Sequence, residues 1–351
     1  MERDRIRRYH RPRYWALLAD LALAVAVPAL LVAAGPDPDV AWWVAAPLLA
    51  GWTVLLTGVV QLPVDAWRGW WHERRFGFST QGLGGWLGDW AKGQLIGVVL
   101  GALALLVLVG LARWLPDAWP LVAAPLAAFV VLVLGFVAPV VLEPLFNRFE
   151  PLADDELADA LRTLSQRAGA PVRDVLVVDA SRRTTKVNAY VSGLGSTRRV
   201  VLFDTLLERL GRPEVAIVVA HELGHRRHRH VLKGTVLGMA AAAAAVLVLW
   251  AALGDDVADP ASAPLVILVV TLLGLAVTPP LAGLSRRWEY ASDRFALELT
   301  GDLRAFEAAF AVLADANLAD PDPPRAVRLL LATHPTVPER IAAARSATVP
   351  A

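Results

Sequence analysis

The stretch Val215-Ala-Ile-Val-Val-Ala-His-Glu-Leu-Gly-His225 is the most informative part of the chain. It ends in an H-E-x-x-H pattern. Residues four apart lie on one face of an α-helix, so His221 and His225 can hold one metal ion together. Glu222 directly follows the first histidine and can reach a water molecule beside that ion. Two imidazoles and a carboxylate base are what a hydrolytic zinc site requires, so the pattern predicts a catalytic metal on this helix.

Short motifs of this kind also arise by chance, so the hypothesis needs a third ligand from elsewhere in the chain. The chain has no cysteine, which excludes disulfides and thiolate ligands. Any zinc must therefore be held by histidine, aspartate or glutamate. The formal net charge of +1 gives no support to nucleic-acid binding, and we expect no nucleic-acid partner.

The composition favours a membrane protein. The chain is 56% hydrophobic, and its mean hydropathy is +0.49 over 351 residues, which is too apolar for an ordinary soluble domain. Thirteen tryptophans against four tyrosines fit aromatic belts at the membrane surfaces. Six apolar stretches are each long enough to cross a hydrocarbon core of about 30 Å. They cover approximately residues 15–34, 41–62, 95–111, 119–142, 231–253 and 264–284.

Charge predicts the orientation of these spans. Arginine and lysine crowd the N-terminal segment, the polar segments 63–94 and 143–233, and the region after the sixth span. The opposite turns carry aspartate and, apart from Arg113, almost no basic residue. The positive-inside rule then puts both termini and the H-E-x-x-H helix in the cytoplasm. We interpret the basic N-terminus as a cytoplasmic anchor, in preference to a signal peptide or a nucleic-acid-binding arm.

The polar segment before the H-E-x-x-H helix predicts an α+β unit. Residues 154–168 have the apolar spacing of an amphipathic helix, and 172–179, 187–192 and 199–203 have the composition of short strands. Residues 205–210 predict a short helix that Gly211-Arg-Pro213 ends.

The third ligand is expected where the chain returns to the same side of the membrane. The fifth and sixth spans form a hairpin that leaves at His230 and comes back at Arg286. Glu289 and Asp293 follow at i and i+4, on one helix face. Glu289 is the predicted third ligand, and Asp293 is placed to accept a hydrogen bond from a ligand imidazole. The alternative is a solvated acidic face paired with Arg286 or Arg287.

At this point the sequence resembles the integral-membrane zinc endopeptidases of the type I CAAX prenyl protease group, and more distantly the heat-shock protease HtpX. The matching segments occur in order along most of the chain. They are Arg75-Phe-Gly-Phe78-Ser-Thr-Gln81 with Trp86, Asp89 and Lys92, Glu143-Pro-Leu-Phe-Asn147-Arg-Phe-Glu-Pro-Leu152, Asn188-Ala-Tyr190, the H-E-x-x-H helix, Ser285-Arg286 with Glu289 and Asp293, and Thr333-His334-Pro335 with Arg340.

The resemblance implies one Zn²⁺ per chain, held by His221, His225 and Glu289, with Asp293 and Arg286 behind these ligands. It implies that Glu222 is the general base that later passes its proton to the leaving amine.

It also implies that His334 and Arg340 stabilise the oxyanion. Asn188, Ala189 and Tyr190 would belong to a strand that binds the substrate backbone by β-addition; a turn or strand-end role is the alternative for Asn188. A surface or helix-capping role is the alternative for His334. We interpret His228 and His230 as interfacial residues.

Together these observations predict a mainly α, multi-pass membrane protein with about six transmembrane helices and a cytoplasmic α+β, zincin-like metalloprotease domain that carries a small sheet. We expect residues 1–142 to form a membrane region with four spans and a cytoplasmic loop at 63–94. Residues 143–351 would form the metalloprotease domain, interrupted by the two-span hairpin 231–284. Six spans differ from the seven of the eukaryotic group.

The expected function is that of a membrane-embedded zinc endopeptidase acting on peptide or protein substrates at the cytoplasmic face. The composition, rich in arginine, alanine and tryptophan, is typical of a high-GC bacterium, so the expected location is the bacterial cell membrane. One alternative is an HtpX-like quality-control protease for damaged membrane proteins. An alternative of a different class is an inactive membrane scaffold, which the presence of Glu222 and three ligands disfavours.

Overall fold

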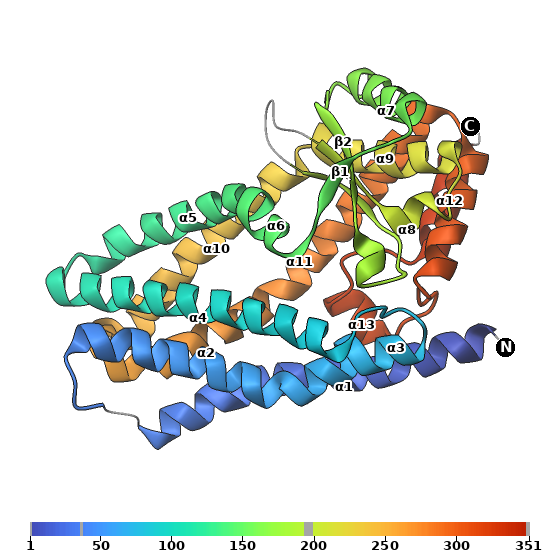
Figure 1. Cartoon of the computed structure of the whole chain (residues 1–351). Coiled ribbons are helices and arrows are strands. Elements are labelled where there is room, and N and C mark those ends of the chain that lie inside the picture. The colour runs from blue at the N-terminus through green and yellow to red at the C-terminus, as the bar shows by residue number, and fades with distance from the viewer. Residues whose placement is uncertain (1, 36–37, 193–198, 349–351) are drawn as a thin grey trace.

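The computed structural model describes residues 2–35, 38–192 and 199–348. Long helices form an elongated bundle, and a smaller α+β region lies at one end of it (Figure 1). The N-terminal end of the chain and the C-terminal helices lie at that same end (Figure 1). The bundle and the α+β region correspond to the apolar and polar stretches of the sequence.

Among the described residues, six helices are long and apolar enough to cross a membrane, judged by length and composition, which is the number predicted. The principal α-helices of these candidates are α1 (Glu2–Ala34), α2 (Trp42–Ala66), α4 (Leu83–Trp114), α5 (Trp119–Val137), α10 (His230–Leu253) and α11 (Ala263–Thr300). Large apolar side chains point out of the bundle: Leu30 is 69% exposed and Leu121 is 76% exposed. Lipid solvates such side chains better than water does.

Several helices extend beyond the predicted spans. The helix α11 runs without a break from the bundle through Pro279 and Pro280 into the α+β region. Residues 63–94 were expected to form a loop, but most of them are helical. The helix α2 continues through a π-helical turn (Trp67–Trp71) into α3 (His72–Arg75), and α4 already begins at Leu83.

The polar composition of residues 63–94 wrongly indicated a loop, because the charged side chains of this segment pair with groups elsewhere in the structure. Arg68 Nη2 lies 3.0 Å from Asp20 Oδ2 on α1. Glu73 is buried and pairs with Arg13 and with Lys186, whose Nζ lies 2.7 Å from Glu73 Oε2. A charge that is paired in this way can be carried on a packed helix.

The α+β region contains a four-stranded mixed sheet. Its strands are β1 (Phe149–Pro151), β2 (Asp174–Val178), β3 (Ala189–Ser192) and β4 (Arg199–Phe203), in the order β1-β2-β4-β3. Strands β2 and β4 are parallel, and the two outer pairs are antiparallel. Three of these strands fall in the predicted ranges. The strand β1 lies outside the predicted ranges, because three residues ending in a proline carry no strand pattern.

The remaining helices connect or cover these parts. They are a π-helical turn (Ala138–Leu142), α6 (Glu143–Phe146), α7 (Asp155–Arg167), a 3₁₀ turn (Ala180–Arg182), α8 (Asp204–Leu207), α9 (Arg212–Arg227), two 3₁₀ turns (Gly254–Ala258 and Pro260–Ser262), α12 (Leu303–Ala316), α13 (Arg325–Leu330) and α14 (Val337–Thr348). The core of the α+β region lies between the sheet, α7, α9, α11 and α12.

The helix α9 is positioned by a close crossing with α11. A Cβ atom at Gly224 would lie 2.9 Å from the Cα atom of Ser292, which leaves no room for a side chain. The apolar residues of α9, such as Val219 and Leu223, are fully buried. The glycine therefore sets the distance between the two helices that carry the predicted metal ligands.

Gly224→Ala is expected to destabilise the protein by about 1–3 kcal/mol, because the methyl group must push the α11 backbone away. Gly274→Ala in α11 is the matched control, since a Cβ atom there meets nothing within 4 Å. Thermal unfolding of the purified protein in detergent measures both changes. Equal midpoints for the two variants would show that α9 and α11 are not held at this distance.

Candidate metal centre

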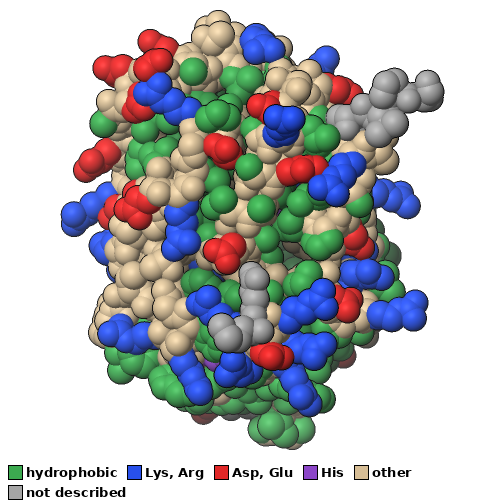
Figure 2. Space-filling view, turned by 90° about the vertical axis from the view of Figure 1, so that its right-hand side faces the viewer, with side chains coloured by type: hydrophobic (Ala, Val, Ile, Leu, Met, Phe, Trp, Pro, Cys, Tyr) green, Lys and Arg blue, Asp and Glu red, His purple; other side chains and the backbone are tan. Residues whose placement is uncertain are grey.

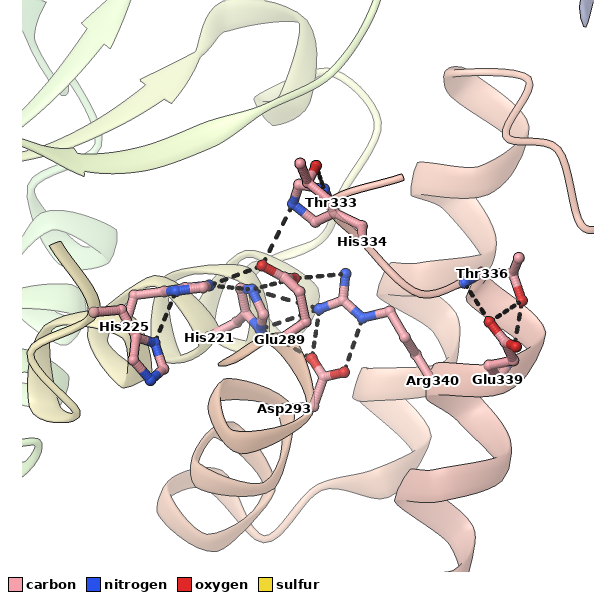
Figure 3. Close-up of polar contacts among 10 residues, drawn as sticks. His221, His225, Glu289, Asp293, Thr333, His334, Thr336, Glu339 and Arg340 are labelled. Carbon is pink, nitrogen blue, oxygen red and sulfur yellow. Dashed lines mark hydrogen bonds and ion pairs between the residues drawn. The ribbon is translucent and has the colours of Figure 1, made fainter. Parts of the chain in front are cut away.

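Two helices bring the three predicted ligands to one point. His221 and His225 come from α9 and Glu289 from α11 (Figure 3). The Nε2 atoms of the histidines lie 3.1 Å apart. Glu289 places Oε1 3.2 Å from His225 Nε2 and Oε2 3.4 Å from His221 Nε2. Each of the three residues thus offers one ligand atom, and these three atoms lie within 4.8 Å of one another.

The chemistry of this cluster fits a zinc ion. Glu289 is only 2% exposed, and its buried Oε2 has no hydrogen-bond partner among the described residues. That oxygen lies within ion-pair distance of His221 and of Arg340, at 3.4 and 3.3 Å. A buried carboxylate oxygen without a hydrogen bond is costly unless a cation neutralises it. Two imidazoles and one carboxylate are also an established ligand set for catalytic zinc.

The imidazole of His221 is oriented from behind by Asp293. Asp293 Oδ1 lies 2.9 Å from His221 Nδ1, and a carboxylate there can only accept the proton of that nitrogen. This contact directs Nε2 toward His225 and Glu289. The i, i+4 spacing of Glu289 and Asp293 therefore lets one helix supply both a candidate ligand and its support.

The electrostatics of the cluster favour a bound cation. Burial and the charge of Arg340 lower the pKa of His221, but the adjacent carboxylates of Asp293 and Glu289 outweigh them and raise it to about 9. The surrounding carboxylates thus stabilise a positive charge at this imidazole. Burial raises the pKa of Glu222, against the opposing effect of His221 and His225. A raised pKa makes a carboxylate a better proton acceptor.

The C-terminal segment brings both other predicted catalytic residues to the cluster (Figure 3). His334 precedes α14, its side chain is 62% exposed, and its Nε2 lies 3.4 Å from Glu289 Oε1. Arg340 lies on α14 and is buried. Its Nε donates to Asp293 Oδ2 at 2.8 Å and its Nη2 to Asp293 Oδ1 at 2.5 Å. Arg340 thus holds the carboxylates of Glu289 and Asp293 in place, while His334 lies on the solvent-exposed side of the cluster.

Arg286 has a different position from the other predicted residues. It donates to the carbonyl oxygens of Ala332 and Leu329 at 2.6 and 3.2 Å. None of the hydrogen bonds or ion pairs described for Arg286 reaches His221, His225 or Glu289. It therefore holds the segment that leads to His334 and has no described contact with the ligands.

The three predicted substrate-binding residues lie on or directly before β3, the strand beside α9. In the described part of the chain, β3 pairs with β4 on one side only, so its other edge is open. Asn188 is exposed just before the strand, and Ala189, the first residue of the strand, is buried. Tyr190 donates from its hydroxyl to Glu143 Oε2 at 3.1 Å. The side-chain amide of Asn317 bonds the backbone N–H and carbonyl of Val187 at 3.0 and 3.1 Å, which fixes the entry to the strand.

The histidine His230 lies in the cluster, although it is not among the predicted site residues. Its interpretation as interfacial is wrong, because the residue is 5% exposed and its Nδ1 lies 3.1 Å from His225 Nδ1. Its ring stacks on that of Trp288, with centroids 4.9 Å apart. Arg229, with a left-handed φ of 57°, turns the chain between α9 and α10 and brings His230 back to the site. The sequence carries a signal for this role, a histidine five residues after a ligand.

His230→Ala is expected to weaken zinc binding about 10- to 100-fold, as is usual when a partner of a ligand imidazole is removed. The reason is that His225 loses the group that orients its Nε2. His228→Ala is the control, because that neighbour is exposed and has no described hydrogen bond to His225. Competition with a fluorescent zinc chelator gives both affinities. An unchanged affinity in the first variant would assign the contact a packing role.

Known proteins resemble this chain over most of its length. Residues 151–348 match the model of peptidase family M48, and residues 37–148 match the family described as "CAAX prenyl protease N-terminal, five membrane helices". An uncharacterized metalloprotease of Bacillus subtilis, YhfN, is 32% identical over 299 residues, covering 82% of this chain and 70% of that protein.

Eukaryotic proteins match as well. The CAAX prenyl protease 1 homolog of Arabidopsis thaliana is 29% identical over 330 residues, covering 90% of this chain and 76% of that protein. The crystal structure of Ste24p from S. mikatae superposes with a TM-score of 0.73 at 24% identity, covering 86% of this chain and 79% of that one. This structural match concerns the fold.

The match to peptidase family M48 extends over the H-E-x-x-H helix, Glu289 and both C-terminal residues of the cluster, and α2, α4 and α5 lie in the part that matches a membrane family. A zinc metallopeptidase embedded in a membrane accounts for both parts of the molecule, and the chain belongs to peptidase family M48.

Proposed function

We propose that the chain is a zinc endopeptidase that cleaves peptide bonds at the cytoplasmic face of a bacterial cell membrane, in the manner of a CAAX prenyl protease. The observation that carries this proposal is the cluster of His221, His225 and Glu289 with Glu222 next to it in sequence. We further propose that residues 1–142 form a membrane region and that residues 143–351 form the protease domain.

One Zn²⁺ per chain would be held by His221, His225 and Glu289. When bound, zinc acts as a Lewis acid that polarises a peptide carbonyl and makes a nearby water more acidic. Asp293 and Arg340 hold the carboxylate and imidazole ligands in place from behind, and His230 does the same for His225. The ligands therefore start in the arrangement that the chemistry needs.

Glu222 is the proposed general base. Its carboxylate takes a proton from the attacking water and later gives that proton to the nitrogen of the leaving amine. His334 is proposed to donate from Nε2 to the carbonyl oxygen as that oxygen becomes negative. Arg340 adds a fixed positive charge close by, which lowers the cost of that developing charge.

The open edge of β3 is the proposed place for the substrate backbone. An extended peptide can add to an unpaired strand edge through main-chain hydrogen bonds. Ala189 and Tyr190 lie on this strand, Asn188 directly precedes it, and α9 packs against it. The same strand thus brings a bound peptide close to the candidate metal centre.

The positions of the chain ends support the cytoplasmic orientation. Residues of α1 are tied to the C-terminal region: the Tyr14 hydroxyl donates to Asp320 Oδ2 at 2.7 Å, and His10 Nε2 lies 2.6 Å from the Leu318 carbonyl oxygen. The basic start of α1, the protease region and the C-terminal helices therefore share one side of the bundle. The positive-inside rule assigns that side to the cytoplasm.

The relatives named CAAX prenyl protease 1 make prenylated peptides the first substrates to test. The purified chain should be assayed on a farnesylated peptide and on casein, each with and without 1,10-phenanthroline. Chelator-sensitive cleavage of the farnesylated peptide alone is the expected result. Preferential cleavage of casein would favour a quality-control protease of the HtpX type. A protein with neither activity nor stoichiometric zinc would be a scaffold, and the proposal would fail.

A further inference from the structure

A groove with a basic end and an apolar end runs along α1 where that helix faces the end of α2. The basic end is a cavity of about 1380 Å³ that six arginines line, five of them from α1 and one, Arg75, from α3. Of the described residues, two carboxylates, Asp320 and Asp322, line the same cavity. Its lining therefore carries a clear excess of positive charge.

The apolar end continues directly from the basic end. A second cavity of about 550 Å³ shares Arg11, Pro12 and Trp67 with the first. It runs on between Ala16 and Ala19 of α1 and Val64 of α2, whose small side chains leave the space open. With a rise of 1.5 Å per residue, α1 covers about 16 Å from Arg8 to Ala19. That length spans the polar headgroup layer and the first part of the hydrocarbon layer.

The arginines at the basic end are poorly neutralised by the protein. In the ranges that the structure describes, Arg11 has no hydrogen bond or ion pair, and Arg8 donates only to the backbone carbonyl of Asp4 at 3.3 Å. By contrast, Arg13, on another face of α1, pairs with the buried Glu73. Asp320 already accepts the Tyr14 hydroxyl at 2.7 Å. An anionic ligand would supply the charge that is missing.

The groove lies where a membrane surface is expected. α1 changes there from basic to apolar residues, and Trp15 is 68% exposed. Tryptophan and basic residues together mark the boundary between lipid and water. Figure 2 shows that lysine and arginine side chains gather on the lower part of the end of the molecule that faces the viewer. The basic end thus falls at the level of lipid phosphates.

We propose that this groove binds one anionic phospholipid, a site separate from the metal centre. Its phosphate would accept hydrogen bonds from Arg8, Arg11 and Arg75, since guanidinium groups bind phosphate oxygens with charge-assisted hydrogen bonds. Its acyl chain would lie against Ala16, Ala19 and Val64. A soluble anion fits only the basic end, whereas a phospholipid matches both the charge and the apolar continuation.

Native mass spectrometry of the full-length protein in detergent tests this proposal. The protein is titrated with phosphatidylglycerol, phosphatidylcholine or inorganic phosphate. The dissociation constant of the first bound molecule is measured in each titration. Phosphatidylglycerol should bind at least tenfold more tightly than phosphatidylcholine. Arg8→Gln with Arg11→Gln should weaken phosphatidylglycerol binding by roughly 30-fold, at about fivefold per arginine, and leave phosphatidylcholine unchanged.

Two further variants separate a built site from general attraction to a basic surface. Lys233→Gln with Arg287→Gln removes the same charge from exposed positions on α10 and α11, and should change nothing. Ala16→Leu with Ala19→Leu fills the apolar end and should weaken phosphatidylglycerol binding at constant charge. Equal losses from both arginine and control variants would overturn the proposal. Unchanged phosphatidylglycerol binding in the Ala16→Leu, Ala19→Leu variant would also overturn it. So would competition by inorganic phosphate that is as strong as competition by phosphatidylglycerol itself.

Discussion

Glu222→Gln is expected to lower kcat/KM for peptide hydrolysis by about 10³-fold while the protein keeps its zinc. The amide has nearly the shape of the carboxylate but cannot accept a proton from water, and general base catalysis contributes about 10²–10⁴-fold. Glu222 is not one of the three residues whose ligand atoms cluster, so the metal should stay. Peptide cleavage assays and elemental analysis of zinc per chain measure the two effects separately.

The matched control for this change is Glu214→Gln, two turns earlier on the same helix. It removes an equal charge from α9 far from the cluster and should leave both activity and zinc unchanged. Loss of zinc in Glu222→Gln would mean that this residue is a ligand. Full activity in Glu222→Gln would mean that another group takes the proton.

Glu289→Ala is expected to weaken zinc binding by roughly 10²–10³-fold, and hydrolysis should fall with it. The estimate takes one of three ligands as about a third of a binding free energy of order 10 kcal/mol or more. The change also removes the carboxylate that lies 3.2 Å from His225 and 3.3 Å from Arg340. Zinc titration of the metal-free variant gives the affinity, and a cleavage assay at saturating zinc gives the remaining activity.

Two comparisons make this prediction specific. Glu298→Ala, on an exposed part of α11, should bind zinc normally. Asp293→Ala should cost only about 10–100-fold, because it loses the support of a ligand and not the ligand itself. The reverse ranking, with Asp293→Ala losing the metal and Glu289→Ala keeping it, would move the third ligand to Asp293.

The sequence determined the membrane character and the central motif because both depend on local patterns. A backbone in lipid must satisfy its hydrogen bonds within each helix, so long apolar stretches predict spans directly. His221 and His225 lie on one face of any helix that contains them, and Glu289 and Asp293 do likewise. The number of spans, the approximate place of three strands and the pairing of α9 with a returning α11 followed from these rules.

Only the tertiary structure decided how these elements meet. The helical course of residues 63–75 depends on charged partners on α1 and near β3, which no local pattern reveals. His230 reaches His225 because the left-handed Arg229 turns the chain, and Arg286 supports the segment before His334 instead of the ligands. The distance between the imidazoles and Glu289 depends on the missing side chain at Gly224. Contacts between residues far apart in the chain are set by packing, and packing is decided by all the elements at once.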